Sequence, residues 1–264
     1  MNLENIPKKS LGQNFLNNKS ILSKIVDTAD LTSKDIVLEI GPGTGNLTEI
    51  ILKKKPKEIY VVEKDKNLTA LLYKKFGDKI NIINKDILDC YNDFKFDLPI
   101  KVFGNLPYNV STKILISFIK VENLNKKFGQ FIFVFQKEVA DRIIAEENTR
   151  NYGRLSIISS WKMTKSKIFD ISPESFYPIP KVWSSLVTLS PKANYENLDK
   201  FKNLEHITNL FFNQRRKMIR KPMKVLFKDY EDVAINLKLD LNLRPQNLSL
   251  KKYIEICRYY ESLK

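Results

Sequence analysis

The chain has 264 residues, of which 43% are hydrophobic and 11% aromatic, enough to pack one large domain or one domain with an appendage. Its 45 Lys and Arg against 30 Asp and Glu leave a net charge of +15, which favours a polyanionic partner, with nucleic acid ahead of a membrane surface. A single histidine and two cysteines without a CxxC spacing argue against histidine-dependent hydrolases, metal enzymes, zinc modules and disulfide scaffolds.

No apolar run reaches the 18 or more residues that a membrane helix needs, and the first 16 residues lack the apolar block of a secretion signal. We therefore expect a protein of the reducing cytoplasm, without a bound metal. The sequence assigns no role to His206, Cys90 or Cys257.

Five short runs of β-branched and aromatic residues alternate with stretches that are long enough for helices. The runs are residues 36–40, 59–62, 80–83, 101–103 and 131–135, and the main helical stretches are 47–55, 68–76 and 112–120. Near-continuous apolar runs of this kind are typical of parallel strands that are buried on both faces. The pattern predicts an α/β doubly wound domain over roughly residues 20–190, in which 167–171 and 182–189 could add an antiparallel pair.

From about Tyr195 onward the pattern indicates helices only, with breakers at Pro222 and Pro245. We therefore expect a catalytic domain over residues 1–192 and a small helical domain over residues 193–264.

The loop Gly41–Asn46 follows the first strand and reads G-x-G-x-G, which differs from the dinucleotide-binding G-x-G-x-x-G and from a Walker P-loop. Alone it could be a plain tight turn. Three acidic residues, Glu39, Glu63 and Asp86, lie at the ends of three consecutive predicted strands, where ligands of open α/β sheets bind. Carboxylates there suit an adenosine that carries positive charge rather than a pyrophosphate, and S-adenosylmethionine fits that description.

The fourth strand ends in Gly104-Asn105-Leu106-Pro107-Tyr108. An adenine amino group is a poor nucleophile, because its lone pair is delocalised into the ring. Two oxygens could accept hydrogen bonds from this amino group, those of the Asn105 side chain and of the Leu106 backbone carbonyl. They would direct the nitrogen lone pair at a methyl group, so that positioning and electrostatics supply most of the rate acceleration. Tyr108 offers a ring for stacking, and the base must be extruded or single-stranded. An ordinary turn is the alternative for this motif alone.

Seven motifs in order make the chain resemble the small-subunit ribosomal RNA adenine N6,N6-dimethyltransferase family over residues 8 to about 262. They are Leu11–Leu16, Glu39–Gly45, Asn105–Asn109, Gln136–Val139, Tyr152–Ser156, Phe176–Val182 and Phe212–Lys217. The resemblance implies a class I (Rossmann-like) S-adenosylmethionine-dependent methyltransferase sheet with an all-helical C-terminal domain.

The resemblance also implies which residues bind and act. Its cofactor contacts fall on Asn14, Leu16, Gly41, Glu63, Asp86 and Asn105. We interpret the segment that carries Asn14 and Leu16 as a lid, with Asn14 hydrogen-bonded to the cofactor. Phe176 is a second candidate for stacking on the base, although a core aromatic under its loop is an equal alternative. Trp183 departs from the family pattern, in which an acidic residue is common.

A basic segment near the C-terminus is the predicted RNA-binding element, with Arg215, Arg216, Lys217 and Arg220 as its candidate residues. Lys217, Lys221 and Lys224 follow i, i+4, i+7 spacing and Arg216 and Arg220 follow i, i+4 spacing, which predicts a basic helical face. Such a face would hold phosphates without reading bases.

These features together predict S-adenosylmethionine-dependent dimethylation of two adjacent adenines in the 3′-terminal hairpin loop of small-subunit rRNA during ribosome assembly, by a cytoplasmic monomer. Asn105 and Leu106 would orient the target nitrogen, and Tyr108 would stack on the base. Two alternatives remain open. One is a large-subunit rRNA adenine methylase of the macrolide-resistance type, and the other is a mainly non-catalytic assembly factor.

Overall fold

The computed structural model describes residues 13–263, so Leu11 and Gly12 of the first motif lie outside the described residues. The chain divides into two compact units. The sheet unit holds the chain up to Ala140 together with Thr164–Pro191, and the helical unit holds Asp141–Met163 with Lys192–Lys264. No helix that the structure describes is both long and apolar enough to cross a membrane.

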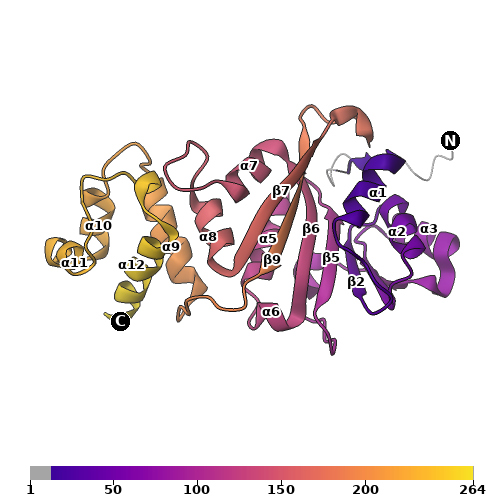
Figure 1. Ribbon diagram of the computed structural model, residues 1–264, viewed down its shortest axis with the longest axis horizontal. Coiled ribbons are helices and arrows are strands. Elements are labelled where there is room, and N and C mark those ends of the chain that lie inside the picture. The colour runs from indigo at the N-terminus through magenta and orange to yellow at the C-terminus, as the bar shows by residue number, and fades with distance from the viewer. Residues whose placement is uncertain (1–12, 264) are drawn as a thin grey trace. The chain divides into compact units, whose positions relative to one another are not determined.

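Seven strands form the main sheet in the order β4-β3-β2-β5-β6-β9-β7 (Figure 1). They are β2 (Ile36–Ile40), β3 (Glu58–Val62), β4 (Asn81–Ile83), β5 (Ile100–Asn105), β6 (Phe128–Gln136), β7 (Met163–Ile171) and β9 (Ser184–Pro191). The strands from β4 to β6 pair in parallel, and β9 pairs antiparallel with β6. The predicted α/β class is confirmed, and the expected late strands lie at the edge beside β6.

Helices α2 to α6 connect the parallel strands, as crossovers between parallel strands require, while α1 precedes β2 and α7 follows β6. The bounds of these helices are α1 (Lys19–Asp27), α2 (Asn46–Lys53), α3 (Lys66–Phe76), α4 (Ile87–Cys90), α5 (Ser111–Ile119), α6 (Leu124–Lys127) and α7 (Lys137–Ile144). Local sequence sets where several begin. The side chains of Asn18, Asp65 and Asp86 accept the first free backbone N–H groups of α1, α3 and α4. The last of these caps places Asp86 at the start of α4, three residues after the end of β4.

The core of the sheet unit is apolar on both faces of the central strands. All five residues of β2 are buried, as expected of a strand that is covered on both sides. On the other side of β5, Phe131 and Phe133 of β6 pack with Phe118 of α5 and Phe128, with ring centroids 5.1–6.5 Å apart. This packing fixes the strand ends from which the site is built.

The helical unit contains α8 (Arg154–Lys162), α9 (Phe201–Phe212), α10 (Arg220–Leu226), α11 (Tyr230–Asn236) and α12 (Leu250–Ser262). Both α9 and α12 pack on α8, and the rings of Phe211 and Tyr253 meet at 5.5 Å. The single boundary predicted at residues 192 and 193 therefore leaves out Asp141–Met163, which groups with the C-terminal helices. The apolar side chains of α8 find their partners on α9 and α12, which neighbouring sequence does not reveal.

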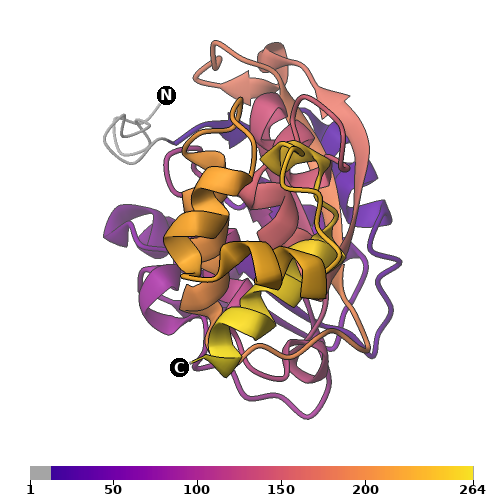
Figure 2. The ribbon, with the colours of Figure 1, turned by 90° about the vertical axis from the view of Figure 1, so that its left-hand side faces the viewer.

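The predicted basic helical face is wrong. Helix α9 ends at Phe212 and α10 begins at Arg220, with turns between them, so the candidate residues share no continuous helix (Figure 2). Pro222 explains the break, because it is tolerated in the first turn of α10 but would clash inside a helix that continued from α9. Ile219 is fully buried in this connection, and its N–H donates to the Leu243 carbonyl.

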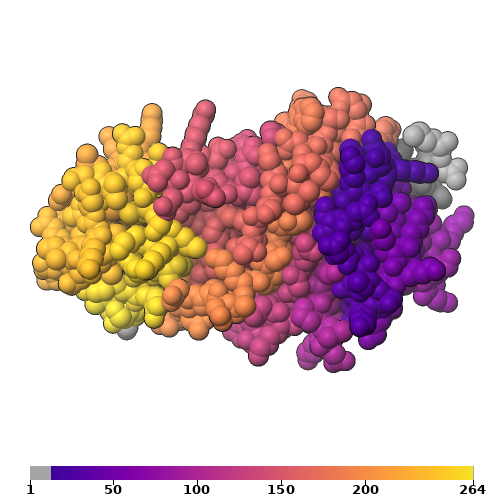
Figure 3. Space-filling view, viewed as in Figure 1, coloured from indigo at the N-terminus to yellow at the C-terminus, as the bar shows by residue number. Residues whose placement is uncertain are grey.

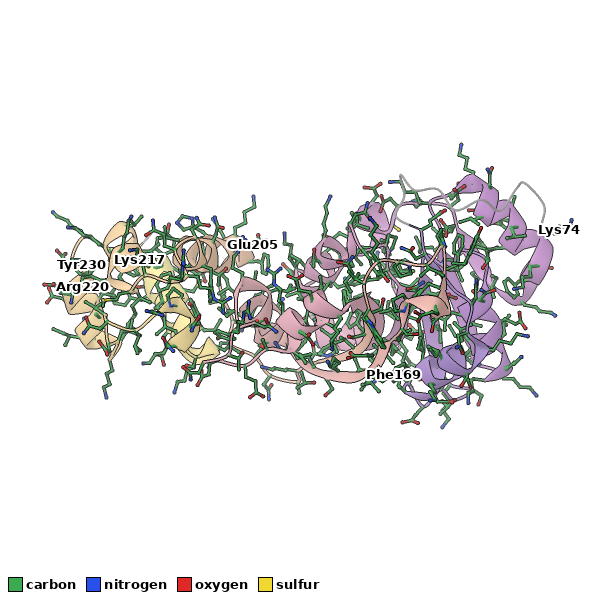
Figure 4. The ribbon with its side chains drawn as sticks, turned by 90° about the horizontal axis from the view of Figure 1, so that it is seen from above. Lys74, Phe169, Glu205, Lys217, Arg220 and Tyr230 are labelled. Carbon is green, nitrogen blue, oxygen red and sulfur yellow. The ribbon has the colours of Figure 1, made fainter. Side chains whose placement is uncertain are left out.

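Two of the four predicted RNA-binding residues make contacts within the helical unit. The Arg215 guanidinium donates to the Gln246 side chain at 3.2 Å, to the Thr149 carbonyl at 3.3 Å and to the Arg150 carbonyl. Arg220 pairs with Glu231 at 3.2 Å. Arg216 and Lys217 are exposed. Figure 4 shows Lys217 and Arg220 at the same end of the helical unit.

We expect Arg215→Ala to lower the stability of the helical unit by about 1–2 kcal/mol, because loss of the charged donor leaves two loop carbonyls without their hydrogen-bond partner. Arg216→Ala is the matched control, since it removes the same charge from an exposed side chain and should change stability by less than about 0.5 kcal/mol. Thermal unfolding and amide exchange of residues 146–150 measure the effect. Equal stability of the two variants would contradict a structural role for Arg215.

Candidate functional site

A cavity of about 240 Å³ opens at the carboxyl ends of the parallel strands, within the sheet unit. Its wall contains eight predicted site residues, namely Asn14, Leu16, Gly41, Glu63, Asp86, Asn105, Leu106 and Tyr108. Ligands of open α/β sheets bind at this edge, where the strand order reverses. The structure thus brings together residues as distant in the sequence as Asn14 and Tyr108, which are 94 positions apart.

The glycine loop enters the cavity with its backbone exposed to it. Gly41 has a φ of +62° and its N–H donates to the Val62 carbonyl at 2.9 Å, which ties the loop to β3. A Cβ at Gly41 would meet no heavy atom within 4 Å, so its backbone borders open space. Glycine therefore provides the turn and lets a ligand approach the main chain closely.

Glu39 is buried, with 2% of its surface exposed, and it lines the cavity. The hydroxyl of Thr48 donates to its carboxyl at 2.6 Å. Burial, assisted by the nearby charge of Glu63, raises the pKa of Glu39 to about 7 even though the Thr48 hydrogen bond opposes the shift. A positively charged ligand in the cavity would stabilise the ionised form of Glu39 and so lower its pKa again.

Glu63 is the second buried carboxyl of the site, and its two oxygens already accept backbone hydrogen bonds. Gly43 N–H donates to one at 3.2 Å and Asp65 N–H to the other at 2.8 Å. Burial raises the pKa of Glu63 in spite of these donors. The contacts fix the carboxylate beside the glycine loop and leave further lone pairs free to accept hydroxyl groups.

Asp86 has more polar surroundings than Glu39 and Glu63 have. One oxygen accepts the N–H of Leu88 at 3.0 Å and the other pairs with the Lys64 ammonium at 2.8 Å. Burial is the largest single effect and raises its pKa, but these partners together outweigh it and hold the pKa below the usual value. Asp86 therefore stays ionised, and it presents its remaining lone pairs beside Ile87 and Leu88 on the cavity wall.

The amide of Asn105 is oriented by the N-terminal segment. Its Nδ2 donates to the backbone carbonyl of Asn14 at 2.8 Å. Since a carbonyl can only accept, the nitrogen of the amide turns toward Asn14 and the oxygen is left as the acceptor on the other side. Leu106 beside it is 1% exposed, which anchors the turn in the core.

Tyr108 is held at its hydroxyl. The hydroxyl lies 2.6 Å from the Ser184 Oγ at the start of β9, and Ser184 is completely buried. Burial raises the pKa of Tyr108, while the hydrogen bond with Ser184 works in the other direction. The ring of Tyr108 lines the cavity and is fixed at its far end. Sequence reasoning missed Ser184, which lies 76 residues away without a motif of its own.

The N-terminal segment crosses the cavity as part of a small second sheet. Strand β1 (Phe15–Leu16) pairs antiparallel with β8 (Phe176–Tyr177). The Asn46 amide donates to the Leu16 carbonyl at 3.0 Å, and the Phe15 ring lies 2.6 Å from where a Cβ on Gly43 would be. The segment is thus attached to the glycine loop at two points, which sequence reasoning did not anticipate.

Phe176 is the one predicted site residue of the sheet unit that does not line the cavity. It is 2% exposed and belongs to the same apolar cluster as Leu16. Its neighbour Tyr177 is 47% exposed instead. In this structure Phe176 is a core aromatic under its loop, which was the alternative to stacking on the base. Within residues 13–263 no three His, Cys, Asp or Glu side chains are grouped so that they could hold a metal ion.

Comparisons with known proteins point to one family. A family model described as "Ribosomal RNA adenine dimethylase" matches residues 5–262. A "Ribosomal RNA small subunit methyltransferase A" of Pelagibacter ubique is 54% identical over 257 residues, which cover 97% of this chain and 98% of the relative. The protein of the same name from Ehrlichia ruminantium is 41% identical over 256 residues and 95% of each chain.

Solved structures show the same fold. A dimethyladenosine transferase from Plasmodium falciparum superposes with a TM-score of 0.75 at 24% identity, over 94% of this chain and 98% of that one. The 23S rRNA methyltransferase ErmE superposes with a TM-score of 0.68 at 20% identity, over 94% and 99%. At these identities the likeness shows the fold alone.

The raised pKa of Glu39 makes stability depend on pH. Between about pH 4.5 and 7 the folded chain keeps a proton that the unfolded chain loses, so stability falls as pH rises through this range. Glu39→Gln stays neutral, and we expect it to gain up to about 3 kcal/mol relative to the parent between pH 5 and pH 8. Urea unfolding at several pH values measures this gain. Glu122→Gln is the control at an exposed position, and parallel profiles for the parent and Glu39→Gln would contradict the assignment.

Proposed function

The chain belongs to the ribosomal RNA adenine dimethylase family, and we propose that it transfers methyl groups from S-adenosylmethionine to the N6 atoms of two adjacent adenines in the 3′-terminal hairpin loop of small-subunit rRNA during ribosome assembly. The observation that carries this proposal is the oriented amide of Asn105 in a cavity that also holds Gly41, Glu63 and Asp86. The protein acts as a monomer in the cytoplasm.

The cavity suits a cationic adenosine derivative. Glu39 and Glu63 are buried carboxyls with raised pKa values, so a sulfonium or ammonium group nearby would stabilise their ionised forms. In the proposed complex Glu63 would accept hydrogen bonds from the ribose hydroxyls and Asp86 would accept one from the adenine amino group. Gly41 would let the ligand approach the backbone. Asn14 and Leu16 close over it with the N-terminal segment. When bound, S-adenosylmethionine would supply the methyl carbon: its bond to sulfur would break with the electron pair left on sulfur as the N6 lone pair bonds to the carbon, and N6 would then lose one proton to solvent.

Asn105 and Leu106 act on the nucleophile by accepting hydrogen bonds. Because its Nδ2 donates to the Asn14 carbonyl, the Asn105 amide has its oxygen available to accept a hydrogen bond from one N6–H, and the Leu106 carbonyl accepts a hydrogen bond from the other. These two hydrogen bonds pull N6 of the target adenine toward a pyramidal geometry and direct its lone pair at the methyl carbon. Tyr108, held by Ser184, presents its ring to the extruded base. Phe176 could stack on the base only after leaving the core in which it is buried.

The helical unit supplies contacts to the RNA backbone. Arg216 and Lys217 are exposed and can pair with phosphates, whereas Arg220 must first leave Glu231. Arg215 supports this surface from below, by holding residues 149 and 150. The large-subunit alternative is disfavoured by the names of the relatives at 54% and 41% identity, and the assembly-factor alternative by the intact Asn105 turn.

We expect labelled methyl groups to pass from the cofactor to undermodified small subunits, with two adjacent dimethyladenines found by nucleotide mapping. Asn105→Ala should lower turnover roughly 100- to 1000-fold, since it removes the acceptor, while cofactor binding stays measurable by equilibrium dialysis. Asn105→Asp should lower turnover too, because its carboxylate would face the Asn14 carbonyl. Asn92→Ala changes an exposed amide and serves as the control.

Label on large subunits alone would support the methylase alternative, and tight subunit binding without any label would support the assembly factor. Full turnover by Asn105→Ala would refute the role of the amide.

Ser184 is a positioning residue, and its link to Tyr108 can be tested by a double-mutant cycle. Tyr108→Phe and Ser184→Ala each remove one end of the hydrogen bond and should lower kcat roughly five- to thirtyfold, with cofactor affinity unchanged. The double variant should be no worse than the poorer single variant, and Ser184→Thr, which restores a hydroxyl, should recover most of the rate. Additive losses would show that the two side chains act independently.

A further inference from the structure

The segment that joins β8 to β9 carries an unusual concentration of exposed apolar side chains. Tyr177, Ile179, Val182 and Trp183 are 47%, 66%, 43% and 50% exposed. They are four of the eleven large apolar residues that are exposed in the described chain, and they fall within seven consecutive positions. We call these four residues the rim patch. Exposed apolar groups that gather in this way mark interaction sites rather than ordinary surface.

Both ends of this segment are fixed to the wall of the cavity. At its start Tyr177 pairs with Phe15, and at its end the Ser184 hydroxyl meets that of Tyr108 at 2.6 Å. Phe15 and Tyr108 both line the cavity. Figure 3 shows the salmon residues of this region on the surface of the sheet unit, next to the indigo N-terminal residues. The rim patch therefore lies on a segment that is attached at both ends to residues of the cavity wall.

The fold leaves about half of the surface of each of these side chains exposed. The flanking residues Phe176 and Ser184 are 2% and 0% exposed and provide the contacts that attach the segment. The backbone of Trp183 is also fixed, because its carbonyl accepts the N–H of Lys137 at 2.9 Å. A rigid backbone that presents a large aromatic side chain to solvent loses little entropy on binding. Such a residue is well suited to stacking.

The charge of the segment indicates the class of ligand. Residues 175–184 include no acidic residue, and Lys181 is exposed and forms no ion pair with any residue between 13 and 263. Lys85 is exposed on the cavity wall as well, whereas Lys64 on that wall is paired with Asp86. Aromatic side chains interleaved with lysines are the pattern that binds single-stranded nucleic acid, where bases stack and phosphates pair with cations.

We propose that the rim patch, chiefly Trp183, stacks on the base next to the target adenine and that Lys181 pairs with a phosphate beside it. This inference rests on the proposed function and extends it to the nucleotide outside the cavity. Since the target is one of two adjacent adenines, the neighbouring base is the second substrate adenine during the first transfer. Stacking would hold it at the opening while the first base occupies the cavity.

Tryptophan fluorescence gives a direct test, because the chain has two tryptophans in different surroundings. Trp183 is 50% exposed, whereas Trp161 is 5% exposed and donates its ring N–H to the Glu196 carbonyl. Titration with a single-stranded RNA that contains the acceptor loop should quench the fluorescence, and Trp183→Phe should abolish the quenching. An RNA without a base next to the target should quench far less.

Kinetics on the same RNA separate stacking from folding defects. Trp183→Ala should raise KM roughly 5- to 150-fold, the range found for loss of one stacked base, with kcat and cofactor affinity within about twofold. Trp183→Phe should restore most of the affinity. Leu98→Ala changes another exposed apolar residue of the sheet unit, near the amino end of β5, and should have no effect.

Normal methylation with unquenched Trp183, or an unchanged KM in Trp183→Ala, would overturn the rim patch while leaving the proposed function intact. Binding of the RNA with quenching but without methyl transfer by the parent would support the patch and refute the proposed function. If Trp183→Ala weakens binding to whole subunits but not to the RNA alone, the patch contacts a protein and the inference is wrong.

Discussion

The bond between the Asn105 amide and the Asn14 carbonyl joins two parts of the site that are 91 residues apart in the sequence. Because the amide nitrogen is used in this bond, the amide oxygen is left as an acceptor, and an acceptor is what a purine amino group needs. The N-terminal segment is therefore more than a cover. Its own position depends on the pairing of β1 with β8 and on the Asn46 amide, so the orientation of Asn105 depends on all of these contacts.

The electrostatics of the cavity run against those of the chain. A protein of net charge +15 places Glu39, Glu63 and Asp86 at neighbouring strand ends, two of them buried with raised pKa values and the third held ionised by Lys64. Buried carboxyls reduce stability at neutral pH, and such a cost is typical of sites that bind a ligand of opposite charge. In the proposed function, the positive charge on the surface has a different partner, the phosphates of the RNA.

The helical unit shows that a regular spacing of charged residues does not by itself predict a helical face. Lys217 and Arg220 lie at the same end of the unit, but Arg215 donates hydrogen bonds to two backbone carbonyls and Arg220 is paired with Glu231. Spacing of i and i+4 indicates a shared face only where a helix is continuous, and Pro222 prevents that here.

The sequence by itself determined the parallel sheet and several residues of the cavity wall. Apolar strands that are buried on both faces and loops at their carboxyl ends are local patterns, so Gly41, Glu63, Asp86 and Asn105 could all be predicted. Only the tertiary structure decided the contacts between distant segments. These are the hydroxyl pair of Tyr108 with Ser184, the burial of Phe176 and the grouping of Asp141–Met163 with the C-terminal helices. No local pattern encodes them, because each depends on which surfaces meet once the chain has folded.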